Sequence, residues 1–151
     1  MPMIDRFARK SVRRVRTSDV VTVAARVAQS AVYVLGGRTV WSHPAGAAKG
    51  ASKFLTSVRN HLRFLDDVGD EQLVKMNAAV MFSGGLLVGT GLAPRIGSAA
   101  LIGSMVPTTL AAFPFWTLST GPERSKSQSD FLKNLGLVAG LATIVIETGR
   151  R

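Results

Sequence analysis

The sequence predicts an all-α membrane protein in which four transmembrane helices form a bundle. The strongest observation is the stretch Asn77–Trp116, where Arg95 is the one charged residue. Pro94 divides this stretch into two apolar segments, each long enough to cross the roughly 30 Å hydrocarbon core of a bilayer. A further apolar segment lies on each side of this hairpin, at Val20–Gly37 and Phe131–Thr148. The 19% of residues that are charged are concentrated outside these four segments.

Composition narrows the class of function. The 151 residues suffice for one domain, and the net charge of +10 comes from basic residues that flank the apolar segments. This placement favours anionic lipid headgroups over nucleic acid as the partner. The chain has no cysteine, which excludes disulfides and cysteine redox chemistry by this chain, and His43 and His61 are its only histidines. We therefore predict no metal site.

Residues 1–18 are predicted to form a basic juxtamembrane segment, ahead of a membrane domain at 19–148 and a basic tail at 149–151. Two interpretations of the first segment stay open: a short amphipathic helix on the membrane surface, or a basic tail that only sets orientation. We expect Val20–Gly37 to be a retained first helix rather than a secretory signal. Arg26 and Gln29 would disrupt the apolar core that a signal needs.

The loop at 38–72 predicts an amphipathic helix from Lys53 onward. Its apolar side chains recur on one helical face: Phe54, Leu55, Val58, Leu62 and Leu65. We expect this helix to lie along the membrane interface or across the end of the bundle. An acidic cluster follows, formed by Asp66, Asp67, Asp70 and Glu71, and we interpret it as a solvated turn rather than a cation site.

The remaining spans are predicted at Leu73–Leu92, Ile96–Leu118 and Phe131–Thr148, with Pro107 kinking the second of these. A polar loop should link the last two. Small residues spaced four apart let membrane helices approach closely. Two such pairs are candidate helix-packing positions: Gly85 with Gly89, and Gly136 with Gly140.

Four spans place both termini on one side of the membrane. The dense basic segment next to the first span favours a cytoplasmic N-terminus, and hence a cytoplasmic C-terminus. The predicted location is the plasma membrane of a bacterium. Trp41 and Trp116 would then both lie at the outer interface, where indole rings prefer to sit.

This topology predicts two polar clusters. The inner cluster contains Arg26, Gln29, Arg95 and Glu147. An arginine inside a membrane normally has a partner, so we expect Arg26 to pair with Glu147; the pair would either fix helix register or serve a function. The outer cluster contains Arg38, Trp41, His43, Lys75, Trp116, Lys133 and Asn134. Aromatic rings beside cations could hold an anionic headgroup, a quinone or a sulfur oxyanion, or could form an ordinary interfacial belt.

Several motifs, in order, resemble the DoxX family of membrane proteins. They are Ala25-Arg26-Val27, Gly36-Gly37, His43-Pro44, Gly84–Leu92 with Pro94-Arg95, Phe113–Trp116 and Phe131–Leu137. The resemblance spans roughly residues 20–147 and implies a four-helix membrane bundle. It also implies a link to membrane-associated redox complexes, since the family is named after a subunit of a thiosulfate:quinone oxidoreductase. The chain departs from the family in lacking cysteine and in having Phe113 where many relatives have a polar residue.

Three functions are compatible with these features. The first is a non-catalytic subunit or scaffold of a membrane-associated redox assembly, with protein partners and with oligomerisation left open. The second is a small oxidoreductase component that presents a quinone or sulfur substrate at the outer cluster. The third is a small carrier that uses Arg26 and Glu147. The sequence indicates no catalytic residues and requires no cofactor, although a quinone is compatible with the second function.

Overall fold

The computed structural model describes residues 17–149, which fold into helices joined by short links. The five α-helices are α1 (Thr17–Ser42), α2 (Pro44–His61), α3 (Asp70–Thr90), α4 (Pro94–Ala112) and α5 (Pro122–Gly149). Two short 3₁₀ helices, η1 (Arg63–Leu65) and η2 (Phe115–Thr117), complete the described part, in which there is no strand. The predicted all-α fold class is confirmed.

Four of these helices are long and apolar enough to span a membrane. The apolar segments contain 23, 21, 24 and 27 residues in α1, in α3, in α4 with η2, and in α5, against the roughly 20 that a bilayer requires. The remaining α-helix, α2, lies between the spans α1 and α3 in the sequence. These lengths and compositions place the protein in the class of multi-pass α-helical membrane proteins.

Glycine and proline determine where the central hairpin turns and ends. Gly91 follows α3 with φ 73°, a left-handed conformation that glycine adopts without steric cost. Pro94 occupies the first turn of α4, where its missing N–H costs no helix hydrogen bond. At the other end Pro114 disfavours helical geometry at Phe113, so α4 stops at Ala112. The helix continues through Pro107 without a break.

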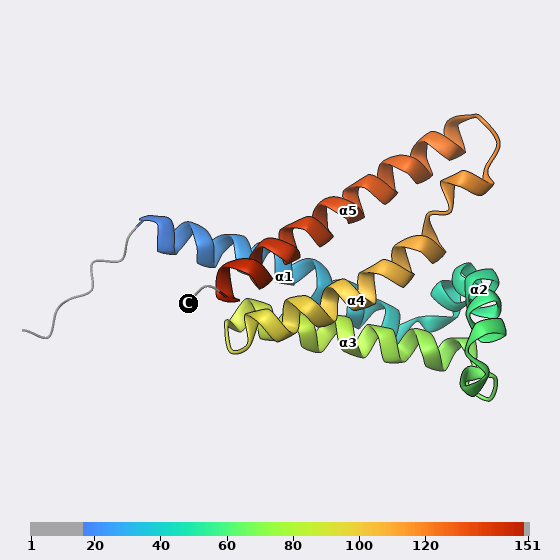
Figure 1. Cartoon of the computed structure of the whole chain (residues 1–151), viewed down its shortest axis with the longest axis horizontal. Helices are drawn as coiled ribbons and strands as arrows, with labels where there is room; N and C mark the ends of the chain where they lie inside the picture. The colour runs from blue at the N-terminus through green and yellow to red at the C-terminus, as the bar shows by residue number, and fades with distance from the viewer. Residues whose placement is uncertain (1–16, 150–151) are drawn as a thin grey trace, which may run out of the picture.

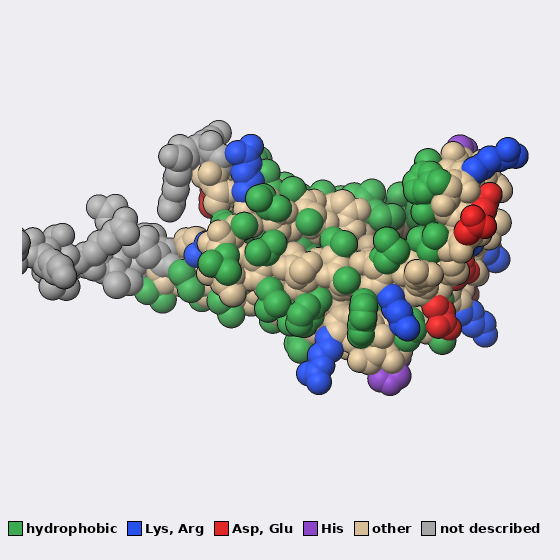
Figure 2. Space-filling model, turned by 90° about the horizontal axis from the view of Figure 1, so that it is seen from below, with side chains coloured by type: hydrophobic (Ala, Val, Ile, Leu, Met, Phe, Trp, Pro, Cys, Tyr) green, Lys and Arg blue, Asp and Glu red, His purple; other side chains and the backbone are tan. Residues whose placement is uncertain are grey.

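The bundle has two distinct ends. The start of α1, the α3–α4 turn and the end of α5 lie together at one end, which we call the terminal end (Figure 1). Helix α2 lies across the other end, the α2 end, where it contacts α3 and α4. Most of the acidic side chains visible in Figure 2 gather at the α2 end, and no acidic side chain is visible on the middle of this face, where many apolar side chains lie.

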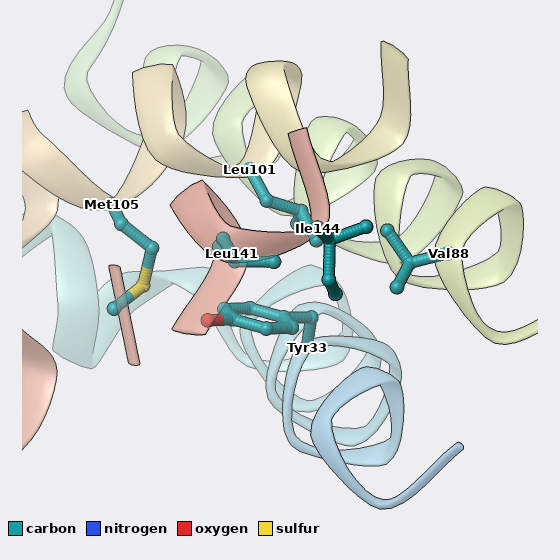
Figure 3. Close-up of a cluster of buried hydrophobic side chains, with 6 residues drawn as sticks. All are labelled: Tyr33, Val88, Leu101, Met105, Leu141 and Ile144. Carbon is teal, nitrogen blue, oxygen red and sulfur yellow. The ribbon is translucent and has the colours of Figure 1, made fainter. Parts of the chain in front are cut away.

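The core lies where all four spans meet. Figure 3 shows its buried side chains converging: Tyr33 from α1, Val88 from α3, Leu101 and Met105 from α4, and Leu141 and Ile144 from α5. Tyr33, Val88, Leu101 and Leu141 are fully buried. Every span therefore contributes to one apolar centre.

Several predicted boundaries are wrong. Helix α2 begins at Pro44 rather than near Lys53, because the small residues between them are helical. Helix α5 begins at Pro122, so the predicted polar loop before Phe131 forms the first turns of this helix. Helix α1 continues to Ser42 instead of ending at Gly37. The predictions for residues 1–16 and 150–151 lie outside the described residues.

Candidate functional site

The predicted inner cluster does not assemble around an ion pair. Within residues 20–148 the ion pairs are Arg59–Asp70 at 2.6 Å and Lys133–Asp130 at 2.9 Å, and neither involves Arg26 or Glu147. Glu147 and Arg95 are both exposed. The geometry thus gives no support to a charge relay between Arg26 and Glu147.

Arg26 lies instead against the turn that ends α3. A Cβ atom placed on Gly91 would be 3.4 Å from Nη1 of Arg26. The carboxyl end of a helix carries partial negative charge, so the guanidinium occupies a favourable position there. Its Nε atom is buried and has no hydrogen-bond partner.

Gln29 forms a hydrogen bond between α1 and α5, two spans whose backbones come close at few points. Its amide Nε2 donates a hydrogen bond to the carbonyl oxygen of Leu137 at 3.1 Å. A Cβ atom placed on Gly140 would lie 2.9 Å from the same nitrogen. Gln29 therefore joins α1 to α5, a role that its polarity inside a span could have indicated.

The predicted outer cluster is divided between two places. Trp116 of η2 packs edge-on against Phe115 and Phe131, with ring centroids 5.2 and 6.0 Å away. On α5, Lys133 pairs with Asp130, and Asn134 donates a hydrogen bond to Thr109 of α4 at 3.2 Å. These residues form the α4–α5 part of the cluster.

Arg38 and Trp41 belong to the α1–α3 part. They line a groove of about 640 Å³ between α1 and α3, together with Gly37, Ala78, Ala79, Val80, Phe82 and Ser83. His43 is exposed and precedes α2, whereas Lys75 is half-buried on α3. The sequence could not show this division, because it depends on which helices are neighbours.

A hydrogen-bond network that the sequence analysis missed links α3 to α4. Asn77 Nδ2 donates to Oγ1 of Thr108 at 3.0 Å, and Ser104 Oγ donates to Oδ1 of Asn77 at 2.8 Å. Thr108 in turn donates to the carbonyl oxygen of Ser104 at 2.7 Å. The signal was an asparagine within an apolar span, since polar side chains in membranes bond between helices.

Glycines bring α1, α3 and α4 into close contact. Gly85 and Gly89 face Ser30 of α1; a Cβ on Gly89 would lie 2.5 Å from Oγ of Ser30. Gly37 meets backbone rather than side chain, since its Cβ would lie 2.8 Å from the Ala78 carbonyl oxygen. Gly97 of α4 packs against α3 in a similar way, since a Cβ on Gly97 would lie 2.8 Å from the Gly84 carbonyl oxygen. Gly37 and Gly97 were not predicted, because neither helix carries a second glycine at the required spacing facing the same neighbour.

One member of the acidic cluster, Asp70, has a structural role. Arg59 of α2 pairs with Asp70 and also donates to the carbonyl oxygens of Leu65 and Val68, at 3.3 and 2.7 Å. These bonds fix the corner between α2 and α3. No group of three or more acidic or histidine side chains in residues 17–149 could hold a metal ion.

Comparison with known proteins adds no relative: no protein-family model matches the sequence, and neither the curated proteins nor the solved structures yield a match. The class of multi-pass α-helical membrane protein therefore rests on the helices themselves. The candidate sites are the groove between α1 and α3 and the seam between α1 and α5. We define the seam by Gln29 and Tyr33 of α1 and Gly136, Leu137 and Gly140 of α5.

Proposed function

We propose that this chain is a non-catalytic subunit of a membrane-bound assembly and that a transmembrane helix of a partner protein packs along the seam. The observation that carries the proposal is the incomplete packing of α5. This helix packs along α4, but its contacts with α1 are few and include the Gln29–Leu137 hydrogen bond. In Figure 1, α5 diverges from α3 towards the α2 end. A partner helix could occupy the side that α5 leaves open.

Gly136 gives the seam its small-residue surface. It lies one helical turn from Gly140, on the same edge of α5. Gln29 fills the space at Gly140, whereas no atom of a neighbouring helix in the described part of the chain would lie within 4 Å of a Cβ atom on Gly136. Leu132 and Leu135, on the same part of α5, are 56% and 52% exposed. A small residue flanked by leucines is a surface on which a second helix can approach closely.

The resemblance to the DoxX family supports the redox character of the assembly and its location in a bacterial plasma membrane. The basic residues before α1 support a cytoplasmic N-terminus and C-terminus. In that orientation the α2 end would face outward.

Photo-cross-linking in native membranes tests the partner. A photoreactive residue at Gly136 should give one defined adduct with a protein that itself spans the membrane and belongs to an oxidoreductase complex. The matched control is Leu86, which is 44% exposed on α3 away from the seam, and it should not give this adduct. Adducts with lipid alone, or equal adducts from both positions, would contradict the proposal.

A second measurement separates a subunit from a catalyst. Deletion of this chain should lower the amount of partner in the membrane fraction while leaving the activity per remaining partner molecule unchanged. A quinone that co-purifies with the chain and is lost with Trp116→Ala or Lys133→Ala would instead favour the oxidoreductase component. Proton-linked flux in liposomes that Glu147→Gln abolishes would favour the carrier.

A further inference from the structure

The groove between α1 and α3 has a polar end and an apolar body. Helices α1 and α3 are antiparallel, so Arg38 and Trp41, near the end of α1, mark the side of the groove that faces the α2 end. Phe82 and Ser83 lie further along α3 and mark the side towards the middle of the membrane. The order of residues along the two helices thus places a cation and an indole at the α2 end of the groove, next to its apolar part.

The floor of the groove exists because the two helix backbones nearly touch. Gly37 and Ala78 are both buried, and no side chain separates them. The flanking residues Trp41, Val80 and Phe82 are exposed, with Trp41 at 54%, so the groove opens towards the surroundings of the bundle. A volume of about 640 Å³ is within the size range of binding pockets for small molecules.

The charged residues at the polar end of the groove indicate which kind of amphiphile it binds. Arg38 is exposed at the polar end, and no ion pair within residues 20–148 includes it. Lys75 lies four residues before Ala79, hence on the same face of α3 and one turn nearer the α2 end. Asp70 pairs with Arg59. The exposed Glu71 lies four residues before Lys75, so helical spacing places it beside Lys75 rather than Arg38. The polar end is therefore suited to an anion.

We propose that this groove binds an anionic phospholipid. Its phosphate contacts Arg38 beside the Trp41 ring, and one acyl chain lies over Ala79 and along Phe82. The lipid covers apolar surface that the bundle itself leaves open, and it does so on a different pair of helices from the partner seam. This inference is independent of the proposed function.

Trp41 and Trp116 are the only tryptophans in the chain, which makes the test direct. Trp116→Phe leaves Trp41 as the sole fluorophore, in the groove. Trp41→Phe leaves Trp116, which packs against Phe115 and Phe131, as the matched control. Each protein is reconstituted in nanodiscs over the same series of fractions of brominated phosphatidylglycerol or of brominated phosphatidylcholine, because bromine quenches tryptophan on contact.

Trp41 should respond to the anionic lipid at about fivefold lower lipid fraction than to the zwitterionic lipid, the preference expected for one cation near a headgroup. Trp116 should show no comparable preference. Arg38→Gln should abolish the preference of Trp41, Arg38→Lys should retain most of it, and Arg63→Gln, an exposed cation outside the groove, should leave it unchanged.

Filling the groove tests the acyl-chain contact separately. Ala79→Leu should reduce quenching by both lipids, whereas Ala99→Leu, at an exposed position on α4 outside the groove, should not. Equal quenching of Trp41 by the two lipids would overturn the proposal. So would displacement of both lipids by a neutral long-chain quinone, or quenching lost because a second copy of the chain covers Trp41.

Discussion

The α1–α3 interface and the α1–α5 seam use the same residue type in opposite ways. At the interface a Cβ on Gly37 would lie 2.8 Å from the Ala78 carbonyl oxygen and 2.9 Å from the Phe82 amide nitrogen, so backbone meets backbone. At the seam Gly140 meets the flexible amide of Gln29, and among residues 17–149 no neighbouring helix comes within 4 Å of a Cβ placed on Gly136. One surface is filled by rigid atoms and the other is held by a side chain.

This difference identifies the fixed and the adjustable parts of the bundle. Helices in lipid gain little from burying apolar surface, so close packing and hydrogen bonds must hold them together. Glycines allow close approach at both contacts of α3: Gly37 and Gly89 where it meets α1, and Gly97 where it meets α4. Helix α5 is joined to α4 by the Asn134–Thr109 bond and packs Phe131 against η2, but its contacts with α1 are few. We infer that α5 adapts to a partner while the other three spans keep their positions.

The largest expected effect is that of Gly37→Leu. The added side chain would collide with backbone atoms of α3, which cannot move aside as a side chain can. We expect a loss of about 3 kcal/mol, the upper end of the usual cost of overpacking. Titration of the purified protein with a denaturing detergent, followed by circular dichroism, measures the change.

Gly136→Leu is the matched control for that substitution. Open space surrounds its Cβ position, so the free energy of unfolding should change by less than about 0.5 kcal/mol. If both leucines cost the same, the contrast between interface and seam does not exist.

Asn77→Leu should have an intermediate effect. The substitution removes the bonds from Asn77 to Thr108 and Ser104 and leaves the Ser104 hydroxyl, which is 5% exposed, with no acceptor from α3. Hydrogen bonds between membrane helices contribute about 0.6 kcal/mol on average, so the two together should cost roughly 1–2 kcal/mol. The same denaturation series checks this.

Asn134→Leu provides the comparison on the adjustable side. It removes the single bond to Thr109 and should cost about 0.6 kcal/mol. A larger loss for Asn134→Leu than for Asn77→Leu would indicate that α5, and not α4, is the better anchored helix.

Gln29→Leu also removes a single bond between spans and should cost about 0.6 kcal/mol, yet it should alter the position of α5. Because the chain has no cysteine, spin labels can be attached to introduced cysteines without background. Labels on Val32 and Leu135 should give a broad distance distribution that Gln29→Leu broadens further. Labels on Leu35 and Leu86, across α1 and α3, should give a narrow one in both proteins. Identical widths for the two pairs would remove the basis for an adjustable seam.

Apolar length and turn residues allowed much of the fold to be predicted. The spans and the turn at Pro94 follow from composition, because a bilayer demands a minimum helix length. The start of α5 did not, since the polar residues after Pro122 look the same in a helix as in a loop. The end of α4 could have been found from Pro114, which disfavours a helical residue before it.

The site was less predictable, because it depends on which helices are neighbours. Arg38 and Trp116 were predicted to belong to one cluster, but Arg38 lines the α1–α3 groove and Trp116 packs beside α5. Arg26 was paired with the wrong kind of group: its guanidinium lies against a helix end rather than within an ion pair. Sequence alone does not give the order of helices around a bundle.

The short link between α3 and α4 has a consequence for how the protein enters the membrane during synthesis. Only Gly91–Ala93 separate the two helices, and Asn77 of α3 accepts a hydrogen bond from Ser104 and donates one to Thr108, both on α4. Either helix alone would carry an unpaired polar side chain into lipid, which is costly. We therefore expect the two to leave the translocation machinery as a pair. After arrest of translation beyond α3 alone, a cysteine introduced in α3 should react with a water-soluble thiol reagent, and extension through α4 should protect it.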